Sequence, residues 1–355
     1  MNGTGTVKTA IVGASGYAGE DLVRLLLGHP RAELVAITSR QYAGQTLAQV
    51  FPKFAHFPKA RALRFQEPNA ELLAKQAEVV FLALPHGVAA EYAVPLVAQG
   101  CRVIDLSADF RIKSAEVYKE FYAHDHPAPE LLSKAVYGLP EFKRAQIREA
   151  TLLACPGCYP TSILIPALPL LEARLIRHDN IIANSLSGVT GAGRKVEQDY
   201  LFAECNESIR AYGVPKHRHL SEIEQELGAV AGDKVTIQFT PHLIPVNRGI
   251  LTTLYFSPSK KFEGGEFLKM EEAVRQVYAK RYGNEPFVRL LEGKAMPDTK
   301  NVVGSNFIEL AWRIDPRTQR VIVISAEDNI VKGTSGQAIQ CFNIMSGFEE
   351  TTGLY

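Results

Sequence analysis

The sequence predicts an α/β fold in which a parallel sheet is followed by a second, mixed or antiparallel sheet. In the first part of the chain, apolar β-like runs alternate with segments of helical spacing, an order typical of parallel sheets. Further along, strand-like runs follow one another with longer and irregular connections, as in an α+β domain. At 355 residues, the chain is long enough for about two domains with sizeable cores.

The first strand-like run, Thr9 to Val12, leads directly into the glycine-rich turn GASGYAG at 13–19, and a helical pattern follows from Glu20 to Leu27. A strand, a glycine turn and a helix are the context of a Rossmann-type dinucleotide-binding domain, where pyrophosphate lies on the helix N-terminus. The spacing G-x-x-G-x-x-G is a variant of the usual pattern, and an ordinary glycine-rich turn is the alternative. Its place at the start of the chain favours the nucleotide interpretation.

The second strand-like run, Ala32 to Thr38, ends at Ser39 and Arg40. An NAD-binding domain has an acidic residue near this point, which binds the ribose 2′-hydroxyl. A hydroxyl and a guanidinium suit a 2′-phosphate instead, because arginine forms charge-assisted hydrogen bonds to phosphate. The sequence therefore predicts NADP as the cofactor, with a solvated arginine at a strand end as the alternative.

Two further β-rich runs, Val79 to Leu84 and Arg102 to Leu106, flank a helical pattern from Val88 to Ala98. Ligands of a parallel sheet bind at the carboxyl ends of its strands, which makes Ser107 and Arg111 candidate site residues. Three histidines of this part of the chain are expected to be turn or surface residues: His86, His124 and His126.

The run Thr151 to Ala154 ends in a Pro-Gly turn that is followed by Cys158. A proline two residues later suits a first helical turn, so Cys158 should lie at a helix N-terminus. Backbone N–H groups and the helix dipole favour an anion there, and we expect the thiol pKa to fall from about 8.5 towards neutrality. Such a thiolate is a nucleophile. The alternatives are a buried structural cysteine or, with Cys155, a redox dithiol or half of a zinc site.

Pro166 and Pro169 are expected to kink or shorten the helix that begins at Cys158. Beyond it, five runs predict the strands of the second sheet: Ile181 to Ser187, Val235 to Thr240, Ile250 to Phe256, Asn306 to Arg313 and Val321 to Ala326.

Polar segments interrupt these strands. The glycine-rich SGVTGAGR at 187–194 would let a flat ring or a phosphate approach the backbone. His217-Arg218-His219 precedes Ser221, a predicted N-cap with Glu224 completing a capping box. A histidine just before a helix start is a candidate general acid or base, with capping or solvent exposure as the alternative.

The charge balance, 39 basic and 38 acidic side chains, gives no electrostatic case for binding nucleic acid or an anionic membrane surface. We expect no signal peptide, because Met1 to Lys8 lacks a basic segment followed by a long apolar one, and no apolar run approaches the roughly 20 residues of a spanning helix. Five cysteines without framework spacing indicate a reducing compartment. We therefore expect a cytoplasmic protein that acts on small metabolites.

Together these segments resemble the N-acetyl-gamma-glutamyl-phosphate reductases, the arginine-biosynthesis relatives of aspartate-semialdehyde dehydrogenase. The PGCYPT core is specific to that family, and the last segment is shared with the semialdehyde dehydrogenases. The resemblance rests on GASGYAG from Gly13, SADFR from Ser107, YGLPE from Tyr137, ACPGCYPTSILIPALP from Ala154, SGVTGAGR from Ser187, HRHLSEIEQEL from His217, FTPHLIPVNRGIL from Phe239 and DNIVKGTSGQAIQCFN from Asp328.

The resemblance implies a role for several residues. Cys158 would be the nucleophile, and His219, favoured over His217, the acid/base group. Residues 1–157 with 330–355 would form the NADP-binding Rossmann domain, and 158–329 the catalytic and oligomerisation domain of a homo-oligomer, dimer or tetramer. No metal is implied. The implied binding residues are Gly13, Ser15, Gly16, Tyr17 and Ala18 for pyrophosphate, Ser39 and Arg40 for the 2′-phosphate, Ser187, Gly188 and Asn329 near the nicotinamide, and Arg111 and Lys195 for the anionic groups of the substrate.

The implied activity is NADPH-dependent reduction of N-acetyl-glutamyl phosphate to the semialdehyde, through a cysteine thioester. Within this class of enzyme, an aspartate-semialdehyde dehydrogenase or a reductase of a carrier-protein-linked acyl phosphate are the alternatives. A thiol hydrolase would also need a cysteine and a histidine, but has no use for the glycine turn. A redox-sensing NADP-binding module would explain the turn and the Cys155–Cys158 pair.

Overall fold

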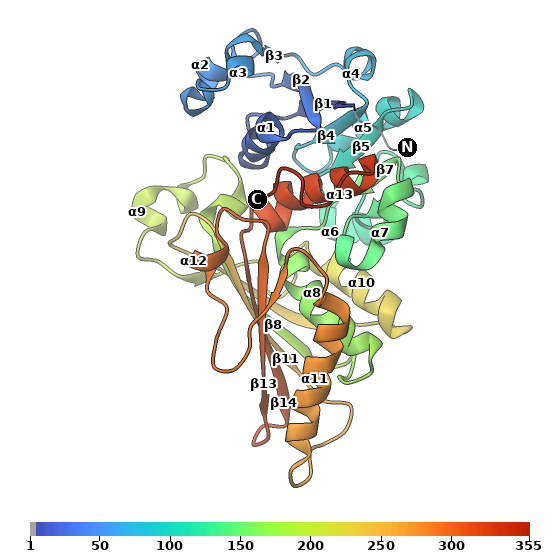
Figure 1. The fold of residues 1–355 in the computed structure, drawn as a ribbon, viewed down its shortest axis with the longest axis vertical. Helices are drawn as coiled ribbons and strands as arrows, with labels where there is room; N and C mark the ends of the chain where they lie inside the picture. Colours follow the sequence, from blue (N-terminus) through green and yellow to red (C-terminus); the bar gives the residue numbers. More distant parts are fainter. Residues whose placement is uncertain (1–4) are drawn as a thin grey trace. The chain divides into compact units, whose positions relative to one another are not determined.

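The computed structural model describes residues 5–355, and the chain divides into two units (Figure 1). The first unit comprises Met1–Pro156 and Thr334–Tyr355, and the second comprises Gly157–Gly333. Each unit contains a seven-stranded sheet. Among the helices of residues 5–355, none is long and apolar enough to cross a membrane.

The sheet of the first unit is parallel throughout, as predicted, in the order β3-β2-β1-β4-β5-β7-β6. Its strands are β1 (Val7–Val12), β2 (Ala32–Thr38), β3 (Phe65–Gln66), β4 (Val79–Leu82), β5 (Arg102–Asp105), β6 (Val136–Tyr137) and β7 (Leu152–Ala154). Its α-helices are α1 (Tyr17–Gly28), α2 (Leu47–Val50), α3 (Pro58–Ala62), α4 (Ala70–Gln76), α5 (Ala89–Ala98), α6 (Ala115–Tyr122), α7 (Pro140–Glu149) and α13 (Gly336–Ser346).

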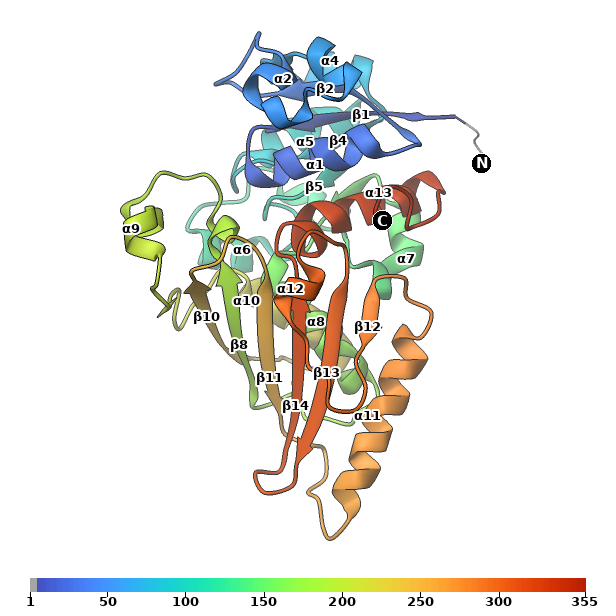
Figure 2. The same cartoon turned by 60° about the vertical axis from the view of Figure 1, so that its left-hand side comes forward.

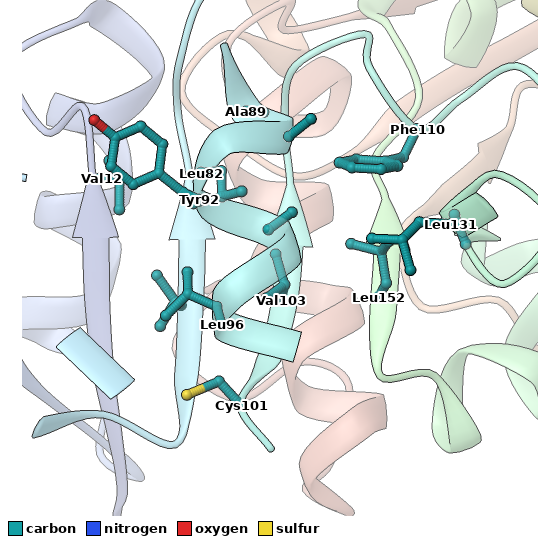
Figure 3. Packing of buried hydrophobic residues seen from close by; sticks show 14 of the residues in the cluster. Val12, Leu82, Ala89, Tyr92, Leu96, Cys101, Val103, Phe110, Leu131 and Leu152 are labelled. Carbon is teal, nitrogen blue, oxygen red and sulfur yellow. The ribbon is translucent and has the colours of Figure 1, made fainter. Parts of the chain in front are cut away.

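The core of this unit includes the apolar side of α5, which packs on the strands beneath it (Figure 3). Ala93 and Leu96 from the helix and Val80 and Val103 from β4 and β5 are all buried there. Residues three or four apart lie on one side of a helix, while every second residue of a strand points to one face. The apolar spacing of the sequence therefore fixes which side of α5 meets the sheet.

The sheet of the second unit is mixed, again as predicted, in the order β12-β13-β14-β11-β8-β10-β9. Its strands are β8 (Ile181–Gly188), β9 (Arg210–Ala211), β10 (Ile237–Ile244), β11 (Ile250–Phe256), β12 (Val288–Leu290), β13 (Ile308–Asp315) and β14 (Arg320–Glu327). Its α-helices are α8 (Cys158–Glu172), α9 (Phe202–Cys205), α10 (Leu220–Ala231), α11 (Glu266–Tyr282) and α12 (Thr299–Val302).

Helices α8, α10 and α11 cover one face of this mixed sheet (Figure 2). Hydroxyl groups join the central helix to the strands: Ser162 of α8 bonds to Thr252 of β11 at 2.8 Å, and Thr252 bonds to Ser185 of β8 at 2.7 Å. Because side chains alternate along a strand, their neighbours point to the other face. Those neighbours are half-buried and largely apolar; we call them the open face: Ile182, Asn184, Leu186, Leu251, Thr253, Tyr255, Ile322 and Ile324.

The central helix α8 runs from Cys158 to Glu172 and continues through both Pro166 and Pro169. The expected shortening at these prolines is therefore wrong. A proline inside a helix removes one N–H donor and leaves the carbonyl four residues earlier without its helical partner. The cost of such a carbonyl in a buried helix is large unless another group satisfies it.

Side chains from two distant elements satisfy the carbonyls that the prolines leave free. The Ser162 carbonyl accepts a hydrogen bond from the Ser325 hydroxyl of β14 at 2.7 Å. The Ile165 carbonyl accepts one from the Tyr282 hydroxyl at the end of α11. Tertiary contacts thus hold a helix that its sequence alone would interrupt.

Two other expectations about this unit need correction. Helix α10 begins at Leu220 with His219 as its N-cap residue. Ser221 therefore lies inside the helix, where its hydroxyl donates to the Arg218 carbonyl. The Glu224 carboxylate accepts from the backbone N–H of Ile237 on β10 rather than completing a capping box. The helix α11 (Glu266–Tyr282) was not predicted.

Candidate active site

A cavity of about 490 Å³ in the second unit contains the cysteine singled out by the sequence. Its size is within the range of small-molecule sites. Its walls come from the start of α8, the end of β8, the glycine-rich 187–194 segment and the segment that leads into α10. The lining residues are Cys158, Tyr159, Ser187, Gly188, Gly191, Ala192, Lys195, Glu197, Asp199, Tyr200, Arg210, Ala211, Tyr212, His217, Arg218, His219 and Leu243.

Cys158 is the first residue of α8 and is partly exposed to this cavity, as the sequence predicted for its helical position. Backbone approaches it closely, because a Cβ atom at Gly333 would lie 2.7 Å from the Cβ of Cys158 and 3.0 Å from Glu327 Oε1. The N-terminus of a helix favours a negative charge through its N–H groups and dipole. This placement therefore supports a thiolate at Cys158.

His219 lies next to the residue that precedes the cysteine. A Cβ atom at Gly157 would be 2.5 Å from His219 Nε2, so only glycine leaves room for the imidazole here. On the other side, Nε2 is 3.9 Å from Oε1 of Glu222, which is buried in the first turn of α10. The structure thus brings His219, Gly157 and Glu222 into contact at the start of α8.

His217 is surrounded by rings and holds a different position. Its imidazole contacts Tyr159, Tyr212 and Phe239 at ring-centroid distances of 5.5 to 5.6 Å. Burial, with a smaller contribution from the Arg218 charge, lowers the pKa of His217 to about 4. Its Nδ1 accepts the backbone N–H of His219 at 3.1 Å, so this nitrogen carries no proton. These contacts suit a neutral ring that fixes its neighbour.

The segment predicted to lie near the nicotinamide is built on tight backbone contacts. A Cβ atom at Gly188 would lie 2.8 Å from backbone atoms of Asn247 and Arg248, so glycine is required there. The Asn329 side chain joins this loop to the residue before β11: its Oδ1 accepts the Gly249 N–H at 2.8 Å, and its Nδ2 donates to Thr190 at 3.0 Å. Ser187 and Gly188 line the cavity.

Lys195 lies on the cavity wall with 74% of its side chain exposed, and it pairs with Glu197. That hydrogen-bonded carboxylate raises the pKa of Lys195. Arg210 likewise pairs with Asp199 at 3.0 Å. The cavity therefore holds cations whose present partners are exposed carboxylates, which a substrate anion can replace at small cost.

The glycine turn of the first unit has the backbone geometry of a dinucleotide fingerprint. Gly13 has φ +85°, and its Cβ atom would lie 2.4 Å from the Ala83 carbonyl oxygen. A Cβ atom at Gly19 would lie 2.3 Å from the Gly13 carbonyl oxygen. Gly16 is the N-cap of α1, which begins at Tyr17 and continues through Ala18. The N-cap of this helix makes no side-chain hydrogen bond, which suits a bound pyrophosphate at the helix start.

Ser39 and Arg40 lie beside this turn at the carboxyl end of β2. The hydroxyl of Ser39 bonds to that of Ser15 in the turn at 3.0 Å. Arg40 is exposed, and its guanidinium donates to the Tyr92 hydroxyl at 3.4 Å, a long contact. An exposed arginine next to the turn is available to a 2′-phosphate.

Arg111 belongs to a buried polar cluster at the carboxyl end of β5. Its Nε donates to the Cys155 carbonyl at 2.7 Å, and its Nη2 donates to the Leu106 carbonyl at 3.0 Å. Asp109 accepts the N–H groups of Gly87, Ala89 and Ala90, and so caps α5 from outside that helix. This SADFR segment therefore shapes the backbone around it.

The same cluster corrects an expectation about the histidines. His126 is buried, not on the surface, and its Nε2 bonds to the Asp109 carbonyl at 2.7 Å. Burial lowers the pKa of His126.

Sequence reasoning missed three cavity or near-cavity groups: Tyr159, Tyr212 and Glu222. The two tyrosine hydroxyls bond to each other at 2.8 Å, and only the fold brings them together. Glu222 carried a usable signal, because it is three residues after His219 across a helix start, where side chains share one side.

Comparison with known proteins agrees with these features. Residues 8–150 match the family model "Semialdehyde dehydrogenase, NAD binding domain", and residues 158–329 match "Semialdehyde dehydrogenase, dimerisation domain". The N-acetyl-gamma-glutamyl-phosphate reductase of Akkermansia muciniphila is 54% identical over 350 residues, which cover 98% of this chain and 99% of that protein. The proteins of the same name from Desulfotalea psychrophila and Pelotomaculum thermopropionicum are 49% and 48% identical, over 98% of this chain and 98% and 97% of theirs.

Solved structures show the same fold at low identity. Aspartate semialdehyde dehydrogenase II of Vibrio cholerae, complexed with ASA, is 16% identical with a TM-score of 0.72, covering 97% of this chain and 99% of that chain. The Candida albicans aspartate semialdehyde dehydrogenase with NADP is 16% identical with a TM-score of 0.70, covering 96% and 99%. The predicted fold class is thus confirmed. With the full-length identities above, these findings establish that this chain belongs to the N-acetyl-gamma-glutamyl-phosphate reductase family of the semialdehyde dehydrogenases.

Proposed function

We propose that this chain reduces N-acetyl-glutamyl phosphate to N-acetyl-glutamate semialdehyde and phosphate with NADPH, in arginine biosynthesis in the cytoplasm. The observation that carries the proposal is the placement of Cys158 at the N-terminus of α8, in a cavity that also contains His219. The family membership of the chain supports the choice of substrate.

The chain's own residues account for acyl transfer to the enzyme. The Cys158 thiol gives its proton to His219, and the thiolate attacks the acyl carbonyl, so that a carbon–sulfur bond forms and inorganic phosphate leaves. Backbone N–H groups at the start of α8 stabilise the oxyanion of this step. Bound NADPH would supply the hydride that reduces the resulting thioester. His219 keeps the thiol proton until then, gives it to the oxyanion that hydride transfer leaves on the cysteine-bound carbon, and takes it back as the carbon–sulfur bond breaks, the aldehyde leaves and the thiolate is restored.

The cofactor assignment rests on the first unit. Gly13, Gly16 and the start of α1, whose N-cap makes no side-chain hydrogen bond, would hold the pyrophosphate. Ser15, Tyr17 and Ala18 lie in the same turn. Ser39 and Arg40 would bind the 2′-phosphate. Ser187, Gly188 and Asn329 would position the nicotinamide, and Lys195 would bind an anionic group of the substrate. The role in substrate binding expected for Arg111 is not proposed again, because this buried guanidinium donates to the Cys155 and Leu106 carbonyls.

Product assays test the proposal against its alternatives. N-acetyl-glutamate semialdehyde and aspartate semialdehyde should be offered side by side with NADP and phosphate, and NADPH formation followed by absorbance. We expect turnover with the acetylated compound. Preference for aspartate semialdehyde would identify an aspartate-semialdehyde dehydrogenase. Activity only with a carrier-bound acyl group would identify a reductase of carrier-protein-linked acyl phosphates.

A homo-oligomer is the second part of the proposal. The open face of the mixed sheet presents half-buried apolar side chains from its central strands, and the matching family model is described as a dimerisation domain. We expect a second copy of the chain to pack there, because apolar sheet faces pack against one another. Ile324→Lys should produce a smaller species in analytical ultracentrifugation. Leu268→Lys, at an exposed site on α11, is the control and should leave the mass unchanged.

A further inference from the structure

Glu222 connects the base to the nucleophile's helix through the two oxygens of one carboxylate. Its side chain is 1% exposed. Oε2 accepts the backbone N–H of Gly157 at 3.2 Å, and Oε1 is 3.9 Å from Nε2 of His219. The second distance is that of an ion pair rather than a hydrogen bond.

The Glu222 carboxylate, the His219 imidazole and the backbone of Gly157 are closely packed. A Cβ atom at Gly157 would lie 2.5 Å from His219 Nε2 and 2.9 Å from Glu222 Oε1, so the three groups touch one another. Burying a carboxylate is costly unless it is paired and hydrogen-bonded, and an apolar side chain would fill the same space at less cost. A buried carboxylate at this position therefore points to a role for its charge.

The charges around His219 indicate what that role is. His217, on the preceding segment, is held neutral by burial, and Arg218 contributes a positive charge. From α8, Cys158 and Tyr159 line the cavity with His219. From β14, the Glu327 carboxylate lies near Cys158 across Gly333. Of these groups, Glu222 is the carboxylate at ion-pair distance from the imidazole, and it favours the protonated ring.

We propose that Glu222 is a positioning residue for His219: one oxygen fixes the backbone next to Cys158, and the other orients the imidazole and stabilises its positive charge. When the Cys158 proton moves to His219, the new imidazolium forms beside a carboxylate that is already in place. This inference rests on the proposed function.

The first test compares two buried carboxylates on one helix. Glu222→Gln keeps an oxygen for the Gly157 N–H but removes the charge. Its kcat should fall about 10- to 100-fold, the range seen when outer partners of metal-bound histidines are lost, with an unchanged KM for NADPH. The limb of the pH–rate profile that reports the histidine should move to lower pH. Glu226→Gln, one turn later and also buried, is the control and should resemble the parent enzyme in both respects.

A double-mutant cycle separates positioning from general support of the fold. If Glu222 acts through His219, Glu222→Gln should cost almost nothing further in a His219→Asn background. Glu222→Asp, which keeps the charge on a shorter side chain, should recover the position of the pH limb more fully than kcat. Fully additive losses with an unmoved pH limb would overturn the proposal.

A readout without substrate keeps this test independent of the proposed reaction. Alkylation of Cys158 by iodoacetamide at neutral pH, located by peptide mass mapping, should slow in Glu222→Gln and in His219→Asn but not in Glu226→Gln. Faster alkylation in Glu222→Gln would mean that the carboxylate acts directly on the thiol, and would refute the inference. If the variants differ in alkylation rate as expected but the parent enzyme has no reductase activity, only the proposed function is contradicted.

Discussion

Two polar segments of this chain look equally catalytic in sequence but are used differently by the fold. In the SADFR segment at 107–111, Asp109 and Arg111 direct their hydrogen bonds to backbone N–H and carbonyl groups. In the HRHLSE segment at 217–222, His219 and Arg218 line a cavity together with Cys158. Polar and charged side chains thus shape the backbone in one segment and face a ligand-sized space in the other.

The difference lies in where the partners of each side chain are. A buried charge surrounded by backbone groups is already satisfied and contributes to stability. A charge or imidazole at a cavity wall keeps part of its bonding capacity for a ligand. Substitutions in the two segments should accordingly separate into losses of activity and losses of stability.

The largest effect is expected at Cys158, on the cavity side of this comparison. Cys158→Ser should lose several orders of magnitude in turnover while it still binds NADP, because the thioester can no longer form. Cys155→Ser, at a fully buried position, should cost far less. Turnover and NADP binding by fluorescence titration check this. Similar losses in both variants would indicate a dithiol.

The next largest effect is expected at His219. His219→Asn should lower turnover by roughly 10²- to 10⁴-fold, the usual contribution of general acid/base catalysis. His217→Asn should cost less in turnover and more in thermal stability, since His217 is enclosed by rings and kept neutral. The reverse order in steady-state assays would assign the proton transfer to His217. His242 precedes the cavity-lining Leu243 on β10, so its side chain points to the other face of the sheet. It is therefore a poor candidate for the proton transfer.

A smaller effect on binding alone is expected at Arg40, an exposed group outside both segments. Arg40→Ala should raise the KM for NADPH by about 10- to 100-fold through loss of a charge-assisted contact, and leave the KM for NADH nearly unchanged. The salt dependence of NADPH binding should weaken as well. Equal losses with both cofactors would place Arg40 in the fold or the adenine pocket.

On the stability side, Asp105 should make unfolding depend on pH. Burial and the neighbouring Asp109 charge raise the pKa of Asp105 to about 7, against about 3.9 in an unfolded chain. Between these values the folded protein keeps a proton that the unfolded chain has released, so the free energy of unfolding falls as pH rises from about 4 to about 7 and is level above.

Asp105→Asn should remove that slope. In urea titrations at several pH values, the free energy of unfolding of the variant relative to the parent should increase as pH rises. The increase should be on the order of 2 to 4 kcal/mol between about pH 4 and about pH 7. The buried histidines His29 and His126 have lowered pKa values, so their contribution to the free energy of unfolding rises with pH. Both proteins contain these histidines, so their contribution cancels when the variant is compared with the parent. Parallel curves for the two proteins would show that Asp105 is ionised in the folded state.

Local patterns predicted much of this fold. Strand β2 (Ala32–Thr38) and strand β11 (Ile250–Phe256) have the predicted bounds, because their apolar runs end at clear polar boundaries. Helix α8 was predicted to begin at Cys158 but not to continue through its prolines, since the groups that sustain it are far along the chain. The helix α11 escaped prediction because few of its residues are buried, so its apolar spacing is weak.

For the site, the sequence indicated residue types but not their partners. Cys158, His217 and His219 were identified from turn and helix signals, and the cavity contains all three. The Glu222 contact with Gly157 depends on the packing of α10 against α8, which no local pattern encodes. His126 was misjudged because a polar neighbourhood in sequence became a buried one in space.

The side chains that hold α8 together also bear on the order in which this protein folds. The hydroxyl that satisfies the Ser162 carbonyl comes from 163 residues later, and the one on the Ile165 carbonyl from 117 residues later. Contacts of such sequence separation form late and slowly. The helix that presents Cys158 therefore gains its full support only after β14 and α11 have been synthesised, and a nascent chain should not hold a competent nucleophile until then.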